Sequence, residues 1–257
     1  MEKYYIENLY LEITRNCTLQ CKHCYKGERR PINMPLDIID KVFNEVGEIE
    51  YLLLTGGEVL MCENELERVL FNIRNNGIKV NYISIITNGT VLNLNIIKIL
   101  KELSLYTNLQ IYISADKFHM MEIERAGLME KRNRNVEILK SLFDAKEWSY
   151  EEKDDLAIDK IGNAETLTLE DLERVNNWGG HKTNYSFKSA EETKQHQSHY
   201  PTAFVTKFNG VFRYVQVDAL GNLSPIYYPY TEEDNLAYGT LNNKLSFINN
   251  LKLIKKN

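Results

Sequence analysis

Short apolar runs alternate with stretches of helical periodicity through the first part of the chain, and this alternation limits the possible folds more than any other feature. The apolar runs predict strands at 8–14, 51–57, 80–89 and 109–116. Apolar residues recur at three- and four-residue spacing in the predicted helices 35–49, 63–77, 94–103 and 135–146. Strands joined by helices of this length form parallel βαβ units. We therefore expect an α/β fold with its ligand site at the carboxyl ends of the strands.

The following residues continue the same pattern for a short distance. Residues 156–164 predict a fifth strand, and residues 167–177 predict a further short helix. We place the end of the strand–helix core here, so the predicted core covers residues 1–180.

The composition changes after the core. Residues 179–200 are polar and predict a loop. Over 204–231, β-forming residues alternate around Asn209-Gly210 and Gly221-Asn222, which are typical of hairpin turns. A small extension that contains β-hairpins is therefore expected over residues 181–257.

The charge balance limits the classes of partner. The net charge is −5 and the isoelectric point is about 5.7, which gives no electrostatic basis for binding nucleic acid or an anionic membrane. The first residues lack the layout of a secretory signal, and no apolar stretch has the length of a membrane span. We expect a cytoplasmic protein that binds neither nucleic acid nor a membrane.

Three of the four cysteines lie within eight residues: Cys17, Cys21 and Cys24. They are too close together to join distant parts of the chain by disulfides, so metal binding or redox chemistry is expected. A structural zinc site would need a fourth ligand, for which His23 is available. Three thiolates without a fourth favour an iron–sulfur cluster with one iron left open. Zinc binding and a redox or structural role remain as alternatives.

The stretch "CTLQCKHCY" resembles the C-x₃-C-x₂-C signature of the radical S-adenosylmethionine (SAM) enzymes. "TGGE" at 55–58 resembles the glycine-rich motif of that family, and it follows the second strand as the family pattern requires. The resemblance covers roughly residues 8–165. It implies a partial (β/α)₆ TIM-like barrel and a [4Fe–4S] cluster held by Cys17, Cys21 and Cys24. SAM would occupy the open iron.

The resemblance also implies contacts to SAM from several strand ends. Gly56, Gly57 and Glu58 would receive the amino group of its methionine part. The remaining implied contacts are Tyr25 beside the adenine, Thr87 and Asn88 after the third strand, and Ser114 and Asp116 after the fourth. Asn and Asp also commonly end strands for reasons of turn chemistry. In "KIGNA", Asn163 stands where many relatives have an arginine, and Lys160 is the nearest cation that could compensate.

The end of the chain resembles the SPASM or "twitch" extension of peptide-modifying relatives. Tyr227 or Tyr228 occupies the expected cysteine region, and no cysteine follows Cys62. The extension is therefore predicted to be degenerate, without ligands for an auxiliary cluster. A redox-neutral reaction would need a hydrogen donor, for which Cys62 is a candidate. His119, just past the fourth strand, is a candidate for proton transfer, and a structural hydrogen bond is the alternative for it.

The resulting prediction is a radical SAM enzyme that cleaves SAM reductively and takes a hydrogen atom from a ribosomally made peptide. The alternatives are the same chemistry on a small metabolite (a sugar, nucleotide or amino acid) and a non-catalytic, metal-bound interaction protein. A flavodoxin or ferredoxin would supply electrons. Little sequence precedes the first strand, so leader recognition is expected to need a separate protein or the barrel itself.

Overall fold

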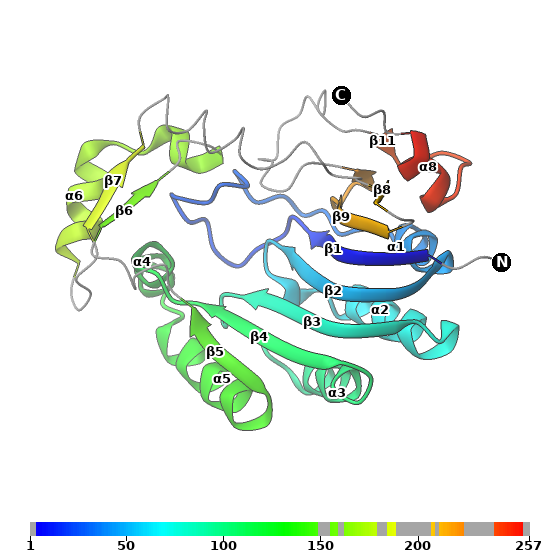
Figure 1. The fold of residues 1–257 in the computed structure, drawn as a ribbon. Helices are drawn as coiled ribbons and strands as arrows, with labels where there is room; N and C mark the ends of the chain where they lie inside the picture. The colour runs from blue at the N-terminus through cyan, green and yellow to red at the C-terminus, as the bar shows by residue number, and fades with distance from the viewer. Residues whose placement is uncertain are drawn as a thin grey trace.

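A nine-stranded sheet forms the centre of the computed structural model, which describes residues 4–148, 155–158, 162–178, 184–188, 207–208, 211–223 and 239–253. The strands follow the order β11-β10-β9-β1-β2-β3-β4-β5, and β8 pairs with β9 (Figure 1). Six adjacent strands run parallel to one another, in the order β9, β1, β2, β3, β4 and β5. The bounds are β1 (Tyr4–Thr14), β2 (Val46–Gly56), β3 (Lys79–Thr87), β4 (Asn108–Ser114), β5 (Asp144–Trp148), β8 (Lys207–Phe208), β9 (Val211–Val217), β10 (Asn222–Leu223) and β11 (Gly239–Thr240).

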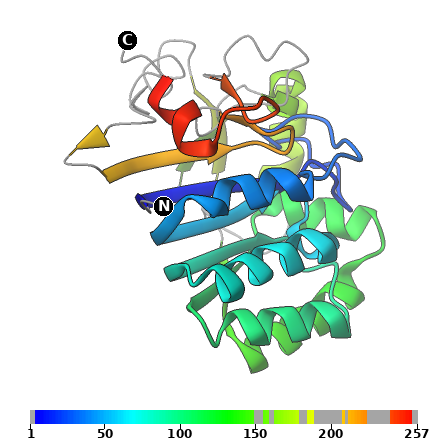
Figure 2. The ribbon, with the colours of Figure 1, turned by 90° about the vertical axis from the view of Figure 1, so that its right-hand side faces the viewer.

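Helices cover one face of this sheet, as the view from the side shows (Figure 2). They are α1 (Leu36–Asn44), α2 (Glu63–Asn76), α3 (Leu94–Leu103) and α5 (Met129–Leu142). Between them and the sheet lies the main apolar core, to which the strands contribute fully buried residues such as Leu52, Ile83 and Ile111. The sheet is open, with β5 and β11 at the ends of the strand order. This arrangement confirms the predicted α/β fold, a partial TIM-like barrel.

The remaining elements lie near the carboxyl ends of the strands or at the end of the chain. Short segments β6 and β7 form a separate two-stranded parallel sheet, which lies beside α6 in Figure 1. The bounds are η1 (Val59–Met61), α4 (Lys117–Arg125), β6 (Asp155–Ile158), η2 (Gly162–Thr166), α6 (Leu169–Asn177), β7 (Asn184–Phe187) and α8 (Phe247–Leu253).

Two helices agree closely with their predictions because their ends carry clear signals. In α2 the buried face is apolar, and Gly77 ends the helix in the left-handed conformation at φ 61°. In α3 the Asn93 side chain accepts a hydrogen bond from Ile96 N at 2.9 Å and caps the first turn.

Several predicted boundaries are wrong. The first helix ends at Asn44 rather than residue 49, because β2 begins at Val46 and buries Val46 and Ile49 in the core. Helix α5 begins at Met129 and ends before Asp144, and residues 144–148 form β5 instead. Helix α4 was not predicted.

The fifth strand of the main sheet is also not the predicted one. Residues 155–158 form β6, which pairs with β7 in the small sheet. Strand β7 falls inside the stretch 179–200, for which the composition predicts a loop; for residues 184–187 that prediction is wrong. Lys160, Tyr227 and Tyr228 lie outside the described residues.

Strand β9 joins the predicted extension to the barrel sheet. It runs parallel to β1, with Ile6 opposite Phe212 and Leu11 opposite Val217. The predicted hairpin at Gly221-Asn222 is confirmed: Asp218 N donates to Asn222 O at 2.9 Å, and Gly221 has φ 78°. Strands β8 and β9 are antiparallel across residues 209–210, which lie outside the described part. The division at residue 180 remains a prediction.

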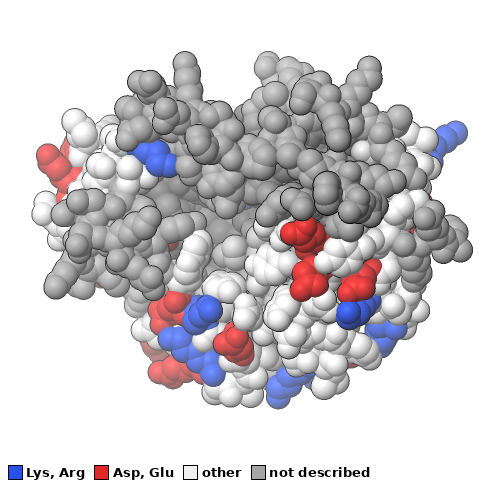
Figure 3. Space-filling view, in the orientation of Figure 1, with Lys and Arg blue, Asp and Glu red and all other residues white. Residues whose placement is uncertain are grey.

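The surface and helix lengths complete the description. Basic and acidic side chains are interspersed over the lower part of the face in Figure 3. No helix in the described part of the chain is both long enough and apolar enough to cross a membrane.

Candidate functional site

The loop that carries three cysteines begins where β1 ends, at the same edge where the other parallel strands end (Figure 1). Two backbone hydrogen bonds attach its start to the end of β2: Gly57 N donates to Thr14 O, and Glu58 N donates to Asn16 O, both at 2.8 Å. The "TGGE" motif therefore lies directly against the cysteine loop, as the predicted meeting of strand ends requires.

Gly56 and Gly57 are required by this backbone contact. A Cβ atom at Gly56 would lie 2.0 Å from Thr14 O, and one at Gly57 would lie 2.1 Å from Asn16 O. Gly56 also has φ 138°, which side chains rarely adopt. The glycines thus allow the backbone after β2 to contact the backbone of the cysteine loop. This contact explains the two glycines without the expected approach to a ligand.

The three thiols of the loop lie in a largely apolar setting beside Leu19 and Ile123. Burial raises the pKa of Cys17 to about 12 and also raises the pKa values of Cys21 and Cys24. The nearby Cys24 adds to the increase for both other thiols, so the three groups are close enough to repel one another as thiolates. Such a trio holds its protons until a positive ligand replaces them.

N–H groups point at two of these sulfurs. Leu19 N donates to Cys17 Sγ at 3.4 Å, and Asn88 Nδ2 donates to the same sulfur at 3.6 Å. Backbone N–H groups of Lys26 and Gly27 lower the pKa of Cys24 against the effect of burial. These donors favour the thiolate form, which is the form that binds metal.

The chemistry of the three thiols bears on which metal group could bind here. Thiolates are the ligands of iron–sulfur clusters, and the loop offers three of them. A structural zinc site usually has four protein ligands, and the three cysteines supply three of these. The donor set therefore fits an iron–sulfur cluster with one iron left open.

Glu58 is completely buried at the edge formed by β2 and β3. Its carboxylate accepts hydrogen bonds from Thr87 Oγ1 at 2.6 Å, Asn88 N at 2.7 Å and Leu60 N at 3.0 Å. Burial raises its pKa in spite of these donors. No ion pair involves Glu58 among the residues that the structure describes.

This carboxylate therefore has no cation within ion-pair distance among the described residues, and His119 acts on it only from further away. A carboxylate offers about four acceptor positions, and three are filled here. One position remains for a donor, and a buried anion is best compensated by a cation. Glu58 thus fits an ammonium group, which SAM carries.

Asn88 connects this group to the cysteine loop. Its Nδ2 donates to Thr18 Oγ1 at 3.0 Å, and its Oδ1 accepts from Thr90 N at 2.9 Å. Both Thr87 and Asn88 are almost fully buried. The structure therefore brings the predicted residues after β3 to the predicted residues after β2.

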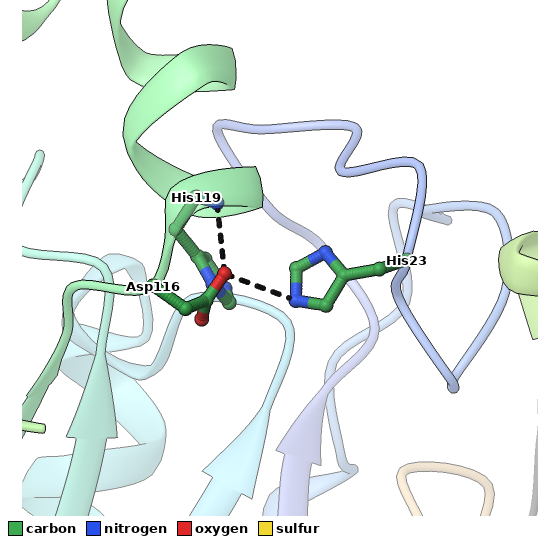
Figure 4. A group of neighbouring side chains, drawn as sticks. All are labelled: His23, Asp116 and His119. Atoms are coloured by element: carbon green, nitrogen blue, oxygen red, sulfur yellow. Dashed lines mark hydrogen bonds and ion pairs between the residues drawn. The ribbon is translucent and has the colours of Figure 1, made fainter. Parts of the chain in front are cut away.

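The residues after β4 form a second polar group with the cysteine loop (Figure 4). Asp116 caps α4 by accepting from His119 N at 3.1 Å, and a hydrogen bond of 2.5 Å joins Asp116 Oδ2 to His119 Nδ1. His23 Nε2 lies 3.4 Å from the other carboxylate oxygen. Ser114 lies next to this group, with its backbone oxygen accepting from Arg132 Nη2 at 3.2 Å.

The electrostatics of the second group follow from one carboxylate between two imidazoles. Burial opposes ionisation of Asp116, but its two histidine neighbours hold its pKa well below the usual value. Burial works against the protonation of His119, yet Asp116 raises its pKa overall. Burial lowers the pKa of His23 to about 4. The three residues offer ligand atoms within 4.8 Å of one another, so a metal ion could bind there, although the hydrogen bond of His119 and the contact of His23 with the carboxylate already account for their arrangement.

Comparison with known proteins identifies the family. The sequence model of the Radical SAM superfamily matches residues 11–147, just over half of the chain. The chain belongs to the radical SAM superfamily. The matched region contains the cysteine loop, the "TGGE" motif and both polar groups at the strand ends.

A curated relative and two solved structures resemble this radical SAM chain. The uncharacterized protein MJ0907 of Methanocaldococcus jannaschii is 29% identical over 125 residues, which is 47% of this chain and 42% of the relative. This chain thus spans less than half the length of that relative. The structure of anSMEcpe with bound AdoMet and Cp18Cys peptide is 16% identical with a TM-score of 0.56, covering 98% of this chain and 81% of that one. Streptococcus suis SuiB bound to precursor peptide SuiA is 14% identical with a TM-score of 0.48, covering 86% and 60%.

The structure connects Tyr25 and Cys62, two residues predicted for the radical SAM site, less directly with the groups described above. Tyr25 is 36% exposed, and Lys26 Nζ lies 5.4 Å from its ring centroid. Cys62 is buried in the main core, and burial raises its pKa to about 12. The roles of Tyr25 beside adenine, of Cys62 as a hydrogen donor and of His119 in proton transfer remain predictions.

Sequence reasoning missed two features of the site. It considered His23 only as a zinc ligand, although the position of this residue between two cysteines already placed it at the site. It also missed a buried charge network in which Glu12 binds Lys26 at 2.7 Å and Arg15 at 3.1 Å, and Arg15 binds Asp218 at 2.9 Å. A glutamate inside the apolar strand 8–14 was the available signal for that network.

Proposed function

We propose that this chain binds a [4Fe–4S] cluster through Cys17, Cys21 and Cys24, binds SAM beside it, and starts radical chemistry on a peptide. When bound and reduced by one electron, the cluster and SAM supply a 5′-deoxyadenosyl radical that takes a hydrogen atom from the substrate. The activity rests on the family match, and the choice of residues rests on the strand-end geometry.

The observation that carries the proposal is the pairing of two incomplete groups at one edge of the sheet. The three thiols have raised pKa values because of burial, and a positive ligand would stabilise their thiolate forms. Beside them, the buried Glu58 carboxylate has no cation within ion-pair distance in the described part of the chain. A cationic cluster and the SAM ammonium would compensate both.

The chain's own residues would act mainly by binding and orientation. Leu19 and Asn88 stabilise the Cys17 thiolate by N–H donation. Thr87 and Leu60 hold the Glu58 carboxylate in one orientation, so that binding an ammonium costs little reorganisation. Apolar neighbours of the thiols restrict water, which strengthens these electrostatic interactions.

A peptide is the substrate class that the fold comparison supports. The solved structure of anSMEcpe, which this chain resembles over nearly its whole length, holds AdoMet and a peptide. We propose a ribosomally made peptide, with a flavodoxin or ferredoxin as electron donor. The strongly reducing chemistry and the free thiols favour the cytoplasm.

Cluster and SAM binding are tested by anaerobic reconstitution with iron and sulfide. The expected result is about four irons per chain and release of 5′-deoxyadenosine on addition of SAM and dithionite. Cys21→Ala should lose both, whereas Cys62→Ala should keep cluster binding and SAM cleavage. Zinc at one ion per chain, with no SAM cleavage, would contradict the proposal and support the non-catalytic alternative.

The substrate class needs a separate experiment. The reconstituted protein is incubated with SAM, reductant and a peptide encoded beside its gene, and a parallel reaction receives pools of sugars, nucleotides and amino acids. A change in peptide mass, or deuterium uptake from solvent at unchanged mass, supports peptide modification. Substrate-dependent 5′-deoxyadenosine formation in the metabolite arm alone would favour the small-molecule alternative.

A further inference from the structure

The segment that follows β6 lies against the backbone of the cysteine loop. Asn163 N donates to Cys24 O at 2.9 Å, and Asn163 Nδ2 donates to Cys21 O at 3.0 Å. One residue therefore contacts the carbonyl oxygens of two of the three cysteines. The two contacts are 142 and 139 residues apart in sequence, so they are formed only by the tertiary fold.

Gly162 allows this close approach. It has φ 59°, and a Cβ atom there would lie 2.3 Å from Tyr25 O and 2.7 Å from Cys24 O. Any side chain at residue 162 would push the segment away from the cysteine loop. Gly162 thus permits the close approach of the two backbones, and Asn163 adds a side-chain donor to the contact.

Further contacts fix the segment from its other end. Asp171 belongs to the capping box of α6, in which it pairs with Thr168. The same carboxylate accepts from Lys22 Nζ at 2.6 Å. Lys22 lies in the loop between Cys21 and Cys24, so the segment from residue 162 to residue 171 contacts this turn on two sides.

The turn itself has little support of its own. Cys24 N donates to Cys21 O at 3.2 Å, which is the only hydrogen bond within the turn among the described backbone contacts. Cys21 O accepts from the Asn163 amide as well, so the side chain of Asn163 fixes the carbonyl around which the turn closes. A loop that is ordered before its ligand binds loses less conformational entropy on binding.

We propose that Asn163 is a positioning residue whose amide holds the Cys21–Cys24 turn in the shape that binds the cluster. This inference rests on the proposed function for its ligand. It assigns to Asn163 a role toward the protein loop.

Asn176 provides a matched control. Its Oδ1 accepts from Tyr185 N at 2.6 Å and its Nδ2 donates to Tyr185 O at 3.0 Å, so it also joins two segments through two backbone contacts. It belongs to the same part of the chain, on α6, but its partner is β7 rather than the cysteine loop. Asn176→Ala therefore shows the effect of a general loss of stability in this region, without loss of a contact to the cysteine loop.

The first test uses the cluster-free protein and measures the rates at which iodoacetamide modifies each cysteine, read by peptide mass spectrometry. Asn163→Ala should raise the rates at Cys21 and Cys24 about fivefold, which corresponds to loss of one hydrogen bond. Asn163→Asp, which keeps the side-chain size but replaces the donor with an acceptor, should do the same once the rates are compared at equal thiolate fraction, because the new carboxylate also raises the pKa of the nearby thiols. The rate at the core residue Cys62 should not change, and Asn176→Ala should leave Cys21 and Cys24 as in the wild type.

The second test measures loss of iron from the reconstituted protein to a chelator. Asn163→Ala and Asn163→Asp should release iron about fivefold faster, while Asn176→Ala matches the wild type. Unchanged alkylation at Cys21 and Cys24 in both Asn163 variants, or equal acceleration in Asn176→Ala, overturns the positioning role. If the wild-type protein takes up no cluster, the proposed function fails, and the alkylation rates still decide whether Asn163 shapes the turn.

Discussion

At the scale of single residues, Glu58 is the clearest candidate for cofactor recognition. The Glu58→Gln variant keeps the size of the side chain and an oxygen that can accept from Thr87 and Leu60. It removes the negative charge, and a hydrogen bond between charged groups contributes about 1.5–3 kcal/mol. We therefore expect SAM to bind the cluster-loaded variant about 10- to 100-fold more weakly, measured by anaerobic equilibrium dialysis.

The control for this prediction is Glu65→Gln. Glu65 is also buried, but it lies on α2 outside the strand-end group. This variant should bind SAM like the wild type. Equal SAM affinity of Glu58→Gln and the wild type, at equal iron content, would remove Glu58 from the binding site.

The pair of Asp116 and His119 predicts a pH dependence of stability. The pKa of His119 is raised in the folded protein and that of Asp116 is lowered. The histidine contribution is therefore complete below the unfolded value of about 6.5 and is lost as the pH rises through the higher folded value. The aspartate contribution is present above about pH 4 and is lost as the pH falls through the lower folded value.

The cluster-free wild type should consequently exceed His119→Gln in stability most clearly between about pH 4.5 and 6.5. In that window we expect a difference of about 1.5–3 kcal/mol, as for a hydrogen bond between charged groups. Urea unfolding of both proteins at pH 5.5 and pH 9 measures it. A difference that does not shrink at pH 9 would show that His119 acts by packing alone.

At the scale of elements, the contact between β2 and the cysteine loop gives a prediction about glycine. Gly57→Ala places a Cβ atom 2.1 Å from the Asn16 backbone oxygen, which a side-chain movement cannot relieve. We expect a loss of about 3 kcal/mol in the free energy of unfolding. Gly77→Ala, at φ 61° with no atom within 4 Å of the new Cβ, should lose only about 1 kcal/mol. Equal losses in thermal unfolding would show that the contact with Asn16 is not tight.

The elements also show why the sequence predicts some parts of the fold and not others. Helices α2 and α3 have an apolar face and clear end signals, so their bounds follow from local pattern. Strand β5 is polar and mostly exposed, and it is a strand only because it pairs with β4. Strand β9 pairs with β1 across about 200 residues, which no local pattern encodes.

The candidate site likewise contains residues that the sequence could place and residues that it could not. The cysteine trio, "TGGE" and the residues after β3 and β4 could be placed because the carboxyl ends of parallel strands share one edge. The contact of His23 with Asp116 and that of Asn163 with Cys21 could not, since each depends on how distant loops fold back. At residue 163 the sequence showed only that an asparagine replaces the arginine of many relatives, and the structure adds the contacts of that asparagine with the cysteine loop.

At the scale of the whole molecule, a buried charge network joins the two ends of the chain at the site. Glu12 and Arg15 at the end of β1 connect Lys26, just past the cysteines, to Asp218 at the end of β9. All four residues are almost completely buried, and their two negative and two positive charges balance. Removing one member of such a network leaves a buried charge uncompensated, which destabilises strongly.

We therefore expect Asp218→Asn to couple the C-terminal segment to the cysteine loop in a measurable way. Asparagine can still accept from Leu220 N and Asn222 N through one oxygen, so the turn after β9 is kept, while its amide faces Arg15. The free energy of unfolding should fall by about 2–3 kcal/mol.

Hydrogen exchange should increase at the amides of residues 24–27 as well as at β9, because Lys26 and Asp218 share the network. Asn222→Ala removes an uncharged donor to Asp218 at 3.2 Å and keeps all four charges of the network, so it is the control and should leave exchange in the cysteine loop unchanged. Faster exchange confined to β9 in Asp218→Asn would mean that the network stabilises β9 and has no effect on the cysteine loop.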